Sequence, residues 1–256
     1  METKPRIAVH KFASCDGCQL ALLNAGPALL ALATRFEFVH FAEAGIVAPE
    51  AEADIALVEG SISTPEEAAR IRAVRERSRV LVSLGACATA GGLQALRNQA
   101  PARAWVQGVY AHPEWIEISD QALPVAEFVK VDHELRGCPV ATDQVLRLLH
   151  DLRLGIPPRP VESSVCLACK RAGHPCVAVT RGEPCLGPVT MDGCGALCPG
   201  QGRGCYGCYG PATTVNAEAL KRHWMDAGLP REEVLRRFRF ITSQAPEFRA
   251  AWEDES

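Results

Sequence analysis

The sequence has little of what marks a nucleic-acid-binding or membrane protein. Its 27 Lys and Arg are outnumbered by 30 Asp and Glu, which gives a net charge of -3, so nothing in the composition predicts binding to nucleic acid or to an acidic membrane surface. No apolar run approaches the ~18 residues that a membrane span requires. The first residues, "METKPRIAVHKFASCDGC", lack the basic segment, apolar segment and cleavage site of a secretory signal, and no twin-arginine pair precedes them. We therefore expect a cytosolic protein with no membrane span.

Nucleotide-binding motifs are also missing. There is no P-loop, and the one match to G-x-G-x-x-G, at 202–207, follows no predicted strand and contains a cysteine. It is therefore rejected as a dinucleotide site. The seven histidines show no metal-ligand spacing, and we interpret His112, His133 and His174 as structural residues. There is no internal repeat. The absences exclude the usual nucleotide and histidine-metal sites from this chain.

Cysteine, in contrast, is abundant. Of twelve cysteines, eight lie between Cys166 and Cys208, with glycine and proline filling much of the space between them. The segment has few large apolar residues, so something other than side-chain packing must offset its conformational entropy. Disulfides, zinc and iron–sulfur clusters are the candidates, and in a reducing compartment twelve cysteines favour metal binding over a disulfide framework.

The first part of the chain alternates predicted strands with predicted helices. Such alternation is typical of an α/β fold with a parallel sheet, and we predict a flavodoxin-like doubly wound parallel sheet. The predicted strands are Arg6–Phe12, Phe36–Ala44, Ala53–Gly60, 79–85 and Phe128–Leu135. The predicted helices are Gln19–Leu32, interrupted at Gly26-Pro27, a helix that begins near Ser63 or Thr64, and Ala141–Gly155.

Composition divides the chain into three parts. The proline-rich stretch Gly155–Ser163 ends the α/β part, so we expect a flavodoxin-like domain at 1–155 and a small irregular cysteine-rich domain at 156–212. A C-terminal helical tail at 213–256 follows, with helices at Asn216–Gly228 and Arg231–Ile241. Its acidic end, "RAAWEDES", is expected to fray.

Four cysteines are predicted to meet at one edge of the sheet. Cys15 and Cys18 follow the first strand, Cys87 follows the fourth and Cys138 follows the last. Ligands of doubly wound sheets bind beyond the carboxyl ends of the strands, so these thiols are candidates for one metal site. The alternative is that Cys87 and Cys138 are ordinary buried thiols.

Zinc and iron–sulfur clusters both use four cysteine thiolates. Structural zinc sites usually consist of two short Cys-x2-Cys pairs, and only Cys166/Cys169 and Cys205/Cys208 have that form within the cysteine-rich segment. Ligands scattered along a sheet edge suit a larger cluster. Glycine-rich loops also bring backbone N–H groups close to an anionic cluster. The pattern favours iron–sulfur clusters, with a zinc-stabilised interaction or scaffold protein as the alternative.

The cysteine motifs resemble those of a known family. "SCDGCQLALLN", "VEGS", "LGACATAGG" and "RGCP" are similar to the small, iron–sulfur subunit of nickel–iron hydrogenases, and "PCLGPVT…DGC…GRGCYGC" resembles its C-terminal cluster segment. The resemblance covers roughly residues 5–212. Within the family, the chain is most similar to the delta subunits of cytosolic sulfhydrogenases that use NAD(P).

The resemblance implies three [4Fe-4S] clusters, held by three groups of four cysteines. The proximal group is Cys15, Cys18, Cys87 and Cys138; the medial group is Cys194, Cys198, Cys205 and Cys208; the distal group is Cys166, Cys169, Cys176 and Cys185. Cys166 stands where membrane-associated relatives have a histidine. Cys198 stands where they often have a proline and a three-iron cluster.

The resemblance also implies an electron-relay subunit of a cytosolic [NiFe] hydrogenase that is inactive alone. Its expected partners are a nickel-bearing large subunit, a flavin/NAD(P)-binding subunit and ferredoxin-like electron-transfer subunits. No nickel, flavin or nucleotide is expected on this chain, because the segment 203–208 matches only one of the two paired motifs that hold nickel. A subunit of a methyl-viologen- or quinone-type reductase complex is the alternative from the same superfamily.

Overall fold

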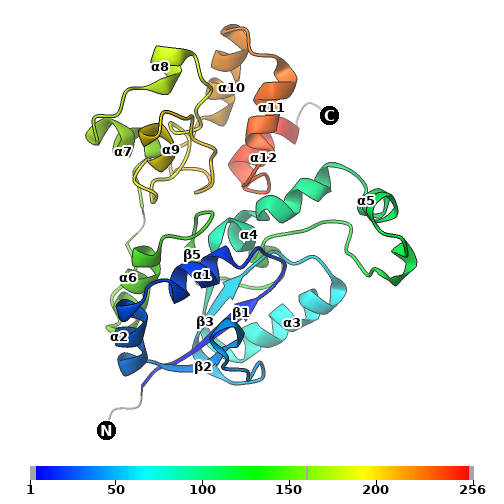
Figure 1. Cartoon of the computed structure of the whole chain (residues 1–256), viewed down its shortest axis with the longest axis vertical. Helices are drawn as coiled ribbons and strands as arrows, with labels where there is room; N and C mark the ends of the chain where they lie inside the picture. The colour runs from blue at the N-terminus through cyan, green and yellow to red at the C-terminus, as the bar shows by residue number, and fades with distance from the viewer. Residues whose placement is uncertain (1–3, 160, 254–256) are drawn as a thin grey trace.

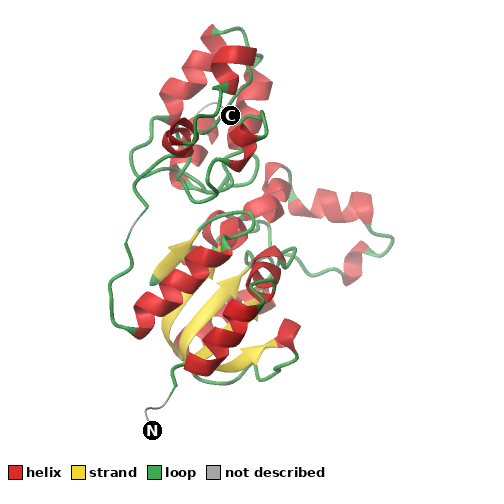
Figure 2. Ribbon diagram, turned by 60° about the vertical axis from the view of Figure 1, so that its left-hand side comes forward, coloured by secondary structure: helices red, strands yellow, loops and turns green. Residues whose placement is uncertain are grey.

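The computed structural model describes residues 4–159 and 161–253. Two lobes are visible in Figure 1: a sheet with its helices, and a second lobe of short helices and loops. A single extended segment after α6 (Thr142–Arg153) connects them on one side of the molecule, as Figure 2 shows. The two lobes meet at the end of the sheet where α1 (Gly17–Leu23), α4 (Gly85–Ala90) and β5 (His133–Leu135) lie.

The sheet has five parallel strands in the order β2-β1-β3-β4-β5. The remaining strands are β1 (Arg6–Lys11), β2 (Glu37–Phe41), β3 (Ala53–Glu59) and β4 (Ser78–Leu84). The order is that of flavodoxin-like folds, so the predicted fold class is confirmed. The predicted last strand, Phe128–Leu135, is shorter than expected. Its first residues form the turn that follows the 3-10 helix η4 (Val125–Glu127), and pairing with β4 begins only at His133.

Helices cover both faces of the sheet. On one face, Leu22 of α1, Leu32 of α2 (Pro27–Arg35) and Leu149 of α6 pack against apolar strand residues. On the other face, Ile71 and Val74 of α3 (Pro65–Glu76) do so. The predicted interruption at Gly26-Pro27 is confirmed as the break between α1 and α2, and α3 begins at a Thr64 cap as its sequence predicts. This packing holds the carboxyl ends of the strands, and the loops on them, in place.

The connection from β4 to β5 contains an arm that the sequence did not reveal. After α4 come the 3-10 helix η2 (Gly92–Gln99), α5 (Ala102–Val109) and the 3-10 helix η3 (Pro113–Trp115). Figure 2 shows this arm standing away from the sheet and then returning to it. A further 3-10 helix, η1 (Ala42–Ala44), follows β2.

The second lobe has its own apolar core. It contains α7 (Val165–Arg171), α8 (Val177–Arg181), α9 (Leu197–Gly200), α10 (Ala217–Asp226), α11 (Arg231–Phe238) and α12 (Pro246–Glu253). Trp224, Phe238 and Phe248 of the last three helices pack against residues of the cysteine-rich segment such as Leu186. The helices therefore supply the apolar core that the cysteine-rich segment cannot form alone.

The expectation that the C-terminal end frays is wrong for residues 249–253. They belong to α12, in which Phe248 and Ala251 are buried. Residues 254–256 lie outside the described part of the chain. The acidic composition misled the prediction, because two apolar residues three positions apart are enough to fix one face of a short helix on a neighbouring core.

Backbone and side-chain contacts join the lobes. Arg136 donates to the Pro211 carbonyl at 3.0 Å, and the Gln244 N–H donates to the Ala90 carbonyl at 3.3 Å. Gln99 donates to the Arg239 carbonyl at 3.3 Å. Cys138 also lies near enough to Cys208 to contribute to the shift of the Cys208 pKa. All of these involve the cysteine-bearing edge of the sheet or the connection that follows it.

No single helix in the described part of the chain is long and apolar enough to cross a membrane. Only α1 and α2 taken together reach the required length and composition, and they are bent by 85° at the break between them.

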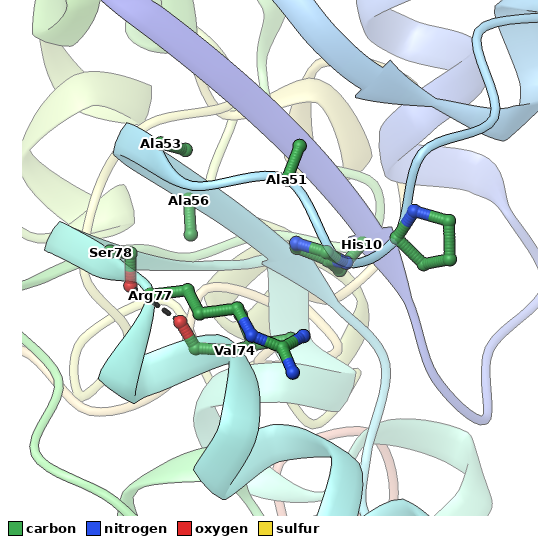
Figure 3. Close-up of a pocket in the computed structure, with 8 residues that line it drawn as sticks. His10, Ala51, Ala53, Ala56, Val74, Arg77 and Ser78 are labelled. Atoms are coloured by element: carbon green, nitrogen blue, oxygen red, sulfur yellow. Dashed lines mark hydrogen bonds between the residues drawn. The ribbon is translucent and has the colours of Figure 1, made fainter.

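A small pocket beside β1 holds a buried histidine and no cysteine among its lining residues. His10 is 5% exposed and faces His40, with ring centroids 4.8 Å apart. Burial, together with the nearby positive charges of His40, Arg70 and Arg77, lowers the pKa of His10 to about 3. Figure 3 shows His10 and Arg77 with the alanines of β3 around the pocket. The imidazole is therefore neutral at ordinary pH, and we interpret it as a packing residue.

Candidate metal centre

The proximal group gathers at the carboxyl edge of the sheet, on the segments that directly follow β1, β4 and β5: Cys18 lies in the first turn of α1, Cys87 in α4, and Cys15 and Cys138 in loops. Cys15 is exposed, Cys18 is buried, and Cys87 and Cys138 are half-buried. Burial first, and then the neighbouring Cys138 and Cys15, raises the pKa of Cys87 to about 11. The pKa of Cys18 is likewise raised, mainly by burial and also by Cys87 and Cys138. The structure therefore places the four thiols within electrostatic reach of one another.

Two glycines leave room for these sulfurs. A methyl group on Gly85 would overlap the Cys18 sulfur, and one on Gly92 would overlap the Cys87 sulfur. Both glycines have positive φ, at 79° and 61°, which other residues adopt only with strain. The sequence "LGACATAGG" thus folds into a turn and a short helix in which the backbone passes directly over two thiols.

A buried carboxylate supports the start of α1. Glu59, at the end of β3, is 2% exposed and accepts hydrogen bonds from the backbone N–H groups of Cys18 at 2.9 Å and Gln19 at 3.1 Å. These groups are among the helical N–H groups that have no partner within the helix. Sequence reasoning did not assign Glu59 a role; its signal was an acidic residue that directly follows the apolar run 55–58 of β3.

The buried side chain of Gln19 indicates that the proximal group binds a ligand with hydrogen-bond acceptors. Its side chain is 1% exposed, and its Nε2 has no hydrogen-bond partner within the described residues. A buried amide without a partner is costly. Gln19 directly follows Cys18, so an acceptor held by the proximal thiols would lie in its neighbourhood.

The distal group lines a single cavity in the second lobe. Cys166, Cys169, Cys176 and Cys185 share a cavity of about 160 Å³ with apolar side chains that include Val177 and Trp224. Burial, followed by the nearby Cys166, Cys185 and Cys176, raises the pKa of Cys169. Ser164 caps α7, its side chain accepting from the Leu167 N–H at 3.3 Å, and so fixes the helix that carries two of these thiols.

The medial group lies between the other two. Burial and then Cys194 raise the pKa of Cys208 to about 12, with Cys198 adding to the shift. Burial also raises the pKa of Cys205 to about 12, although the Gly207 N–H donates to its sulfur at 3.4 Å and so opposes the shift. These thiols come from α9, the loop before it and the glycine-rich loop after it.

One close approach and one hydrogen bond connect the three groups in series. Cys138 of the proximal group lies near enough to Cys208 of the medial group to contribute to the shift of the Cys208 pKa. The Cys205 N–H, in the medial group, donates to the Cys185 sulfur of the distal group at 3.2 Å. The spatial order is therefore proximal, medial, distal, although along the chain the distal cysteines precede the medial ones.

The donor set fits iron–sulfur clusters. All twelve cysteines are free, and the raised pKa values of the buried thiols mean that positively charged metal is needed to hold them as thiolates. Four thiolates per group match the ligand set of a [4Fe-4S] cluster, as they do that of a zinc ion. In the described part of the chain, no group of three or more His, Cys, Asp or Glu is found that could hold a metal ion.

The three histidines interpreted as structural residues, His112, His133 and His174, are not members of the thiol groups. His112 stacks on Trp115, with centroids 4.0 Å apart, and contacts Glu114. His133 opens β5. His174 lies against Gly200 of α9, next to the medial group.

Comparison with known proteins gives a consistent set of relatives. The family described as "NADH ubiquinone oxidoreductase, 20 Kd subunit" matches residues 15–152. The delta subunit of sulfhydrogenase 2 from Pyrococcus furiosus is 36% identical over 91% of this chain and 98% of its own length. The delta subunit of the NAD-reducing hydrogenase HoxS from Cupriavidus necator is 30% identical over 61% of this chain and 82% of its own.

Solved structures agree with these sequences. A chain of an NAD+-reducing [NiFe]-hydrogenase in the H2-reduced state superposes with a TM-score of 0.57 at 32% identity, covering 62% of this chain and 96% of that one. A chain of the actinobacterial-type NiFe-hydrogenase from Ralstonia eutropha H16 has a TM-score of 0.57 at 18% identity and covers 98% of this chain and 89% of that one. The second likeness concerns the fold alone.

Proposed function

The chain belongs to the NADH ubiquinone oxidoreductase 20 Kd subunit family and, within it, to the small subunits of [NiFe] hydrogenases, and on that premise we propose that it carries electrons between a catalytic large subunit and an electron-accepting subunit. Three [4Fe-4S] clusters, one on each four-cysteine group, would supply one-electron transfer. The observation that carries the proposal is the serial arrangement of the three groups, with Cys138 close to Cys208 and the Cys205 N–H bonded to the Cys185 sulfur.

The chain's own residues would set the properties of each site. The Gly207 N–H donates to the sulfur of Cys205 at 3.4 Å, and burial shields the sulfurs of Cys18 and Cys87. Hydrogen bonds to cluster sulfurs and shielding from solvent tune reduction potentials. In the proximal group, the Cys18 loop is further fixed by Glu59.

The two ends of the series would serve different partners. The proximal group, with its exposed Cys15, would face the nickel-bearing large subunit. The distal group, with its exposed Cys176, would face the flavin/NAD(P)-binding and ferredoxin-like subunits; NAD is named for two relatives. Twelve unpaired thiols suit a reducing compartment, so we place the complex in the cytosol.

Hydrogen-dependent reduction should require both subunits. The chain has no nickel-binding motif pair, so it is expected to consume no hydrogen when purified alone and anaerobically. Co-expressed with the large subunit of its hydrogenase, it should reduce a dye with hydrogen, and the cluster EPR signals should appear in the same sample. Hydrogen uptake by the chain alone, or an active complex in which the chain holds no iron, would contradict the proposal.

A further inference from the structure

The arm formed by residues 101–118 exposes more large apolar surface than its length explains. Val109 is 72% exposed and Trp115 is 74% exposed, while Tyr110 and Trp105 are 52% and 48% exposed. Solvated loops are usually polar, and clustered exposed apolar side chains mark interaction sites. Tryptophan and tyrosine are also the residues most enriched among energetically dominant interface contacts.

The base of the arm is rigid. Asn98 and Ala122 exchange two hydrogen bonds, of 2.9 and 2.8 Å, which close the two ends of the arm against each other. Arg97 donates to the Ser119 carbonyl at 3.1 Å, and its own carbonyl accepts from the Trp105 indole at 2.9 Å. A preorganised surface loses less conformational entropy on binding than a mobile loop does.

The tip of the arm is also preordered. Trp115 stacks on His112 at 4.0 Å with an interplanar angle of 15°, and His112 contacts Glu114 at 3.1 Å. One face of the indole is thus held while most of the side chain stays in solvent. On the helix, Ala102 and Val106 are buried and anchor α5, whereas Trp105 and Val109 keep 48% and 72% of their surface exposed.

The arm is joined directly to the proximal group. The Gly91 N–H donates to the Cys87 carbonyl at 3.1 Å, and the backbone of Gly92 lies directly against the Cys87 sulfur. Exposed apolar side chains continue from the arm to this edge: Leu93 at its base is 42% exposed, and Leu20, two residues after Cys18, is 48% exposed. A protein that covers the exposed Cys15 would therefore meet these side chains and the arm.

We propose that residues 101–118 form a docking arm for the large subunit of the hydrogenase, which would clasp Val109, Tyr110 and Trp115 while it covers the proximal edge. The inference rests on the proposed function, since that function gives the proximal edge its partner. The apolar, aromatic character of the arm fits a protein surface, and its continuity with the proximal thiols selects the large subunit over a partner at the distal end.

The test uses the complete complex purified anaerobically. The variant Val109→Asp/Trp115→Asp should weaken binding of the large subunit by about 100-fold, because two central interface contacts are each worth at least tenfold. The matched control Leu154→Asp/Val179→Asp changes side chains that are 54% and 84% exposed on other elements. It should bind the large subunit as the unchanged chain does. Both variants should retain the iron of the unchanged chain.

Hydrogen–deuterium exchange on the unchanged complex provides a second measurement that needs no variant. Backbone amides of 101–118 should be protected when the large subunit binds. Unchanged exchange there, or equal large-subunit binding by the arm variant, would overturn the inference. The inference would also be overturned if the arm variant kept the large subunit but lost the flavin-bearing subunit, or if it kept the large subunit but no longer associated with itself. If the unchanged chain binds no large subunit at all, the proposed function fails instead.

Discussion

Replacing Gly85 with alanine is expected to remove the iron of the proximal group. The new methyl group would overlap the Cys18 sulfur, and the positive φ of 79° at this position adds strain of roughly 1–2 kcal/mol. Cys18 would have to leave its place, and a cubane needs all four thiolates. Iron per chain should fall by about four, and hydrogen-dependent dye reduction by the complex should be lost with it.

The variant Gly45→Ala separates the effect of backbone strain from the effect of steric overlap with the Cys18 sulfur. Gly45 has nearly the same φ, 80°, and an added methyl group would meet nothing within 4 Å. This control should therefore share the backbone strain and keep all its iron and activity. Metal analysis and EPR of the two anaerobically purified variants make the comparison. Equal iron in both would mean that the close approach of Gly85 to Cys18 does not shape the site.

Replacing Gly204 with alanine is expected to disrupt the connection between the medial and distal groups. A methyl group there would overlap the carbonyl oxygen of Pro184, and backbone cannot move aside as a flexible side chain can. The segments 183–185 and 204–205 would have to move apart. That movement would break the hydrogen bond from the Cys205 N–H to the Cys185 sulfur and the one from the Gly204 N–H to the Glu183 carboxylate. We expect loss of up to about eight irons, four from each group, with the proximal signal retained.

Gly108→Ala is the matched control for Gly204→Ala. Gly108 also lacks a positive φ, and an added methyl group would meet nothing within 4 Å. It should leave all the iron in place, and iron content is the readout because Gly108 belongs to the docking arm. Retention of all medial and distal iron in Gly204→Ala, measured by EPR on dithionite-reduced samples, would show that the contact is dispensable.

The sheet and its edge could be read from the sequence because both depend on local pattern. Short apolar strands alternating with helices specify a parallel sheet, and Gly26-Pro27 marks a helix break. Once the strands are placed, Cys15, Cys87 and Cys138 must share one edge. Nothing beyond strand order is needed for that conclusion.

The arm and α12 could not be predicted in the same way. The segment after Gly92 forms 3-10 turns and one short helix, so it has no long helical or alternating period. In α12, the helix depends on Phe248 packing on Phe238 from another helix, with ring centroids 5.7 Å apart. Such tertiary contacts override a local composition that favours disorder.

The local sequence pattern also could not predict the spatial order of the medial and distal groups. Chain order places Cys185 before Cys194, and spacing alone does not say which loops meet. The structure supplies the missing information as the hydrogen bond from the Cys205 N–H to the Cys185 sulfur. The series arrangement could be inferred only from family resemblance until this contact was seen.

The most direct test of three cluster-holding groups is a metal count on the chain in its anaerobically purified complex, combined with Mössbauer spectroscopy. Twelve cysteines in three groups predict about twelve irons on this chain, at four per cluster, with the spectra of [4Fe-4S] centres and no stoichiometric zinc. Stoichiometric zinc with little iron, or iron on only one of the three groups, would contradict the account.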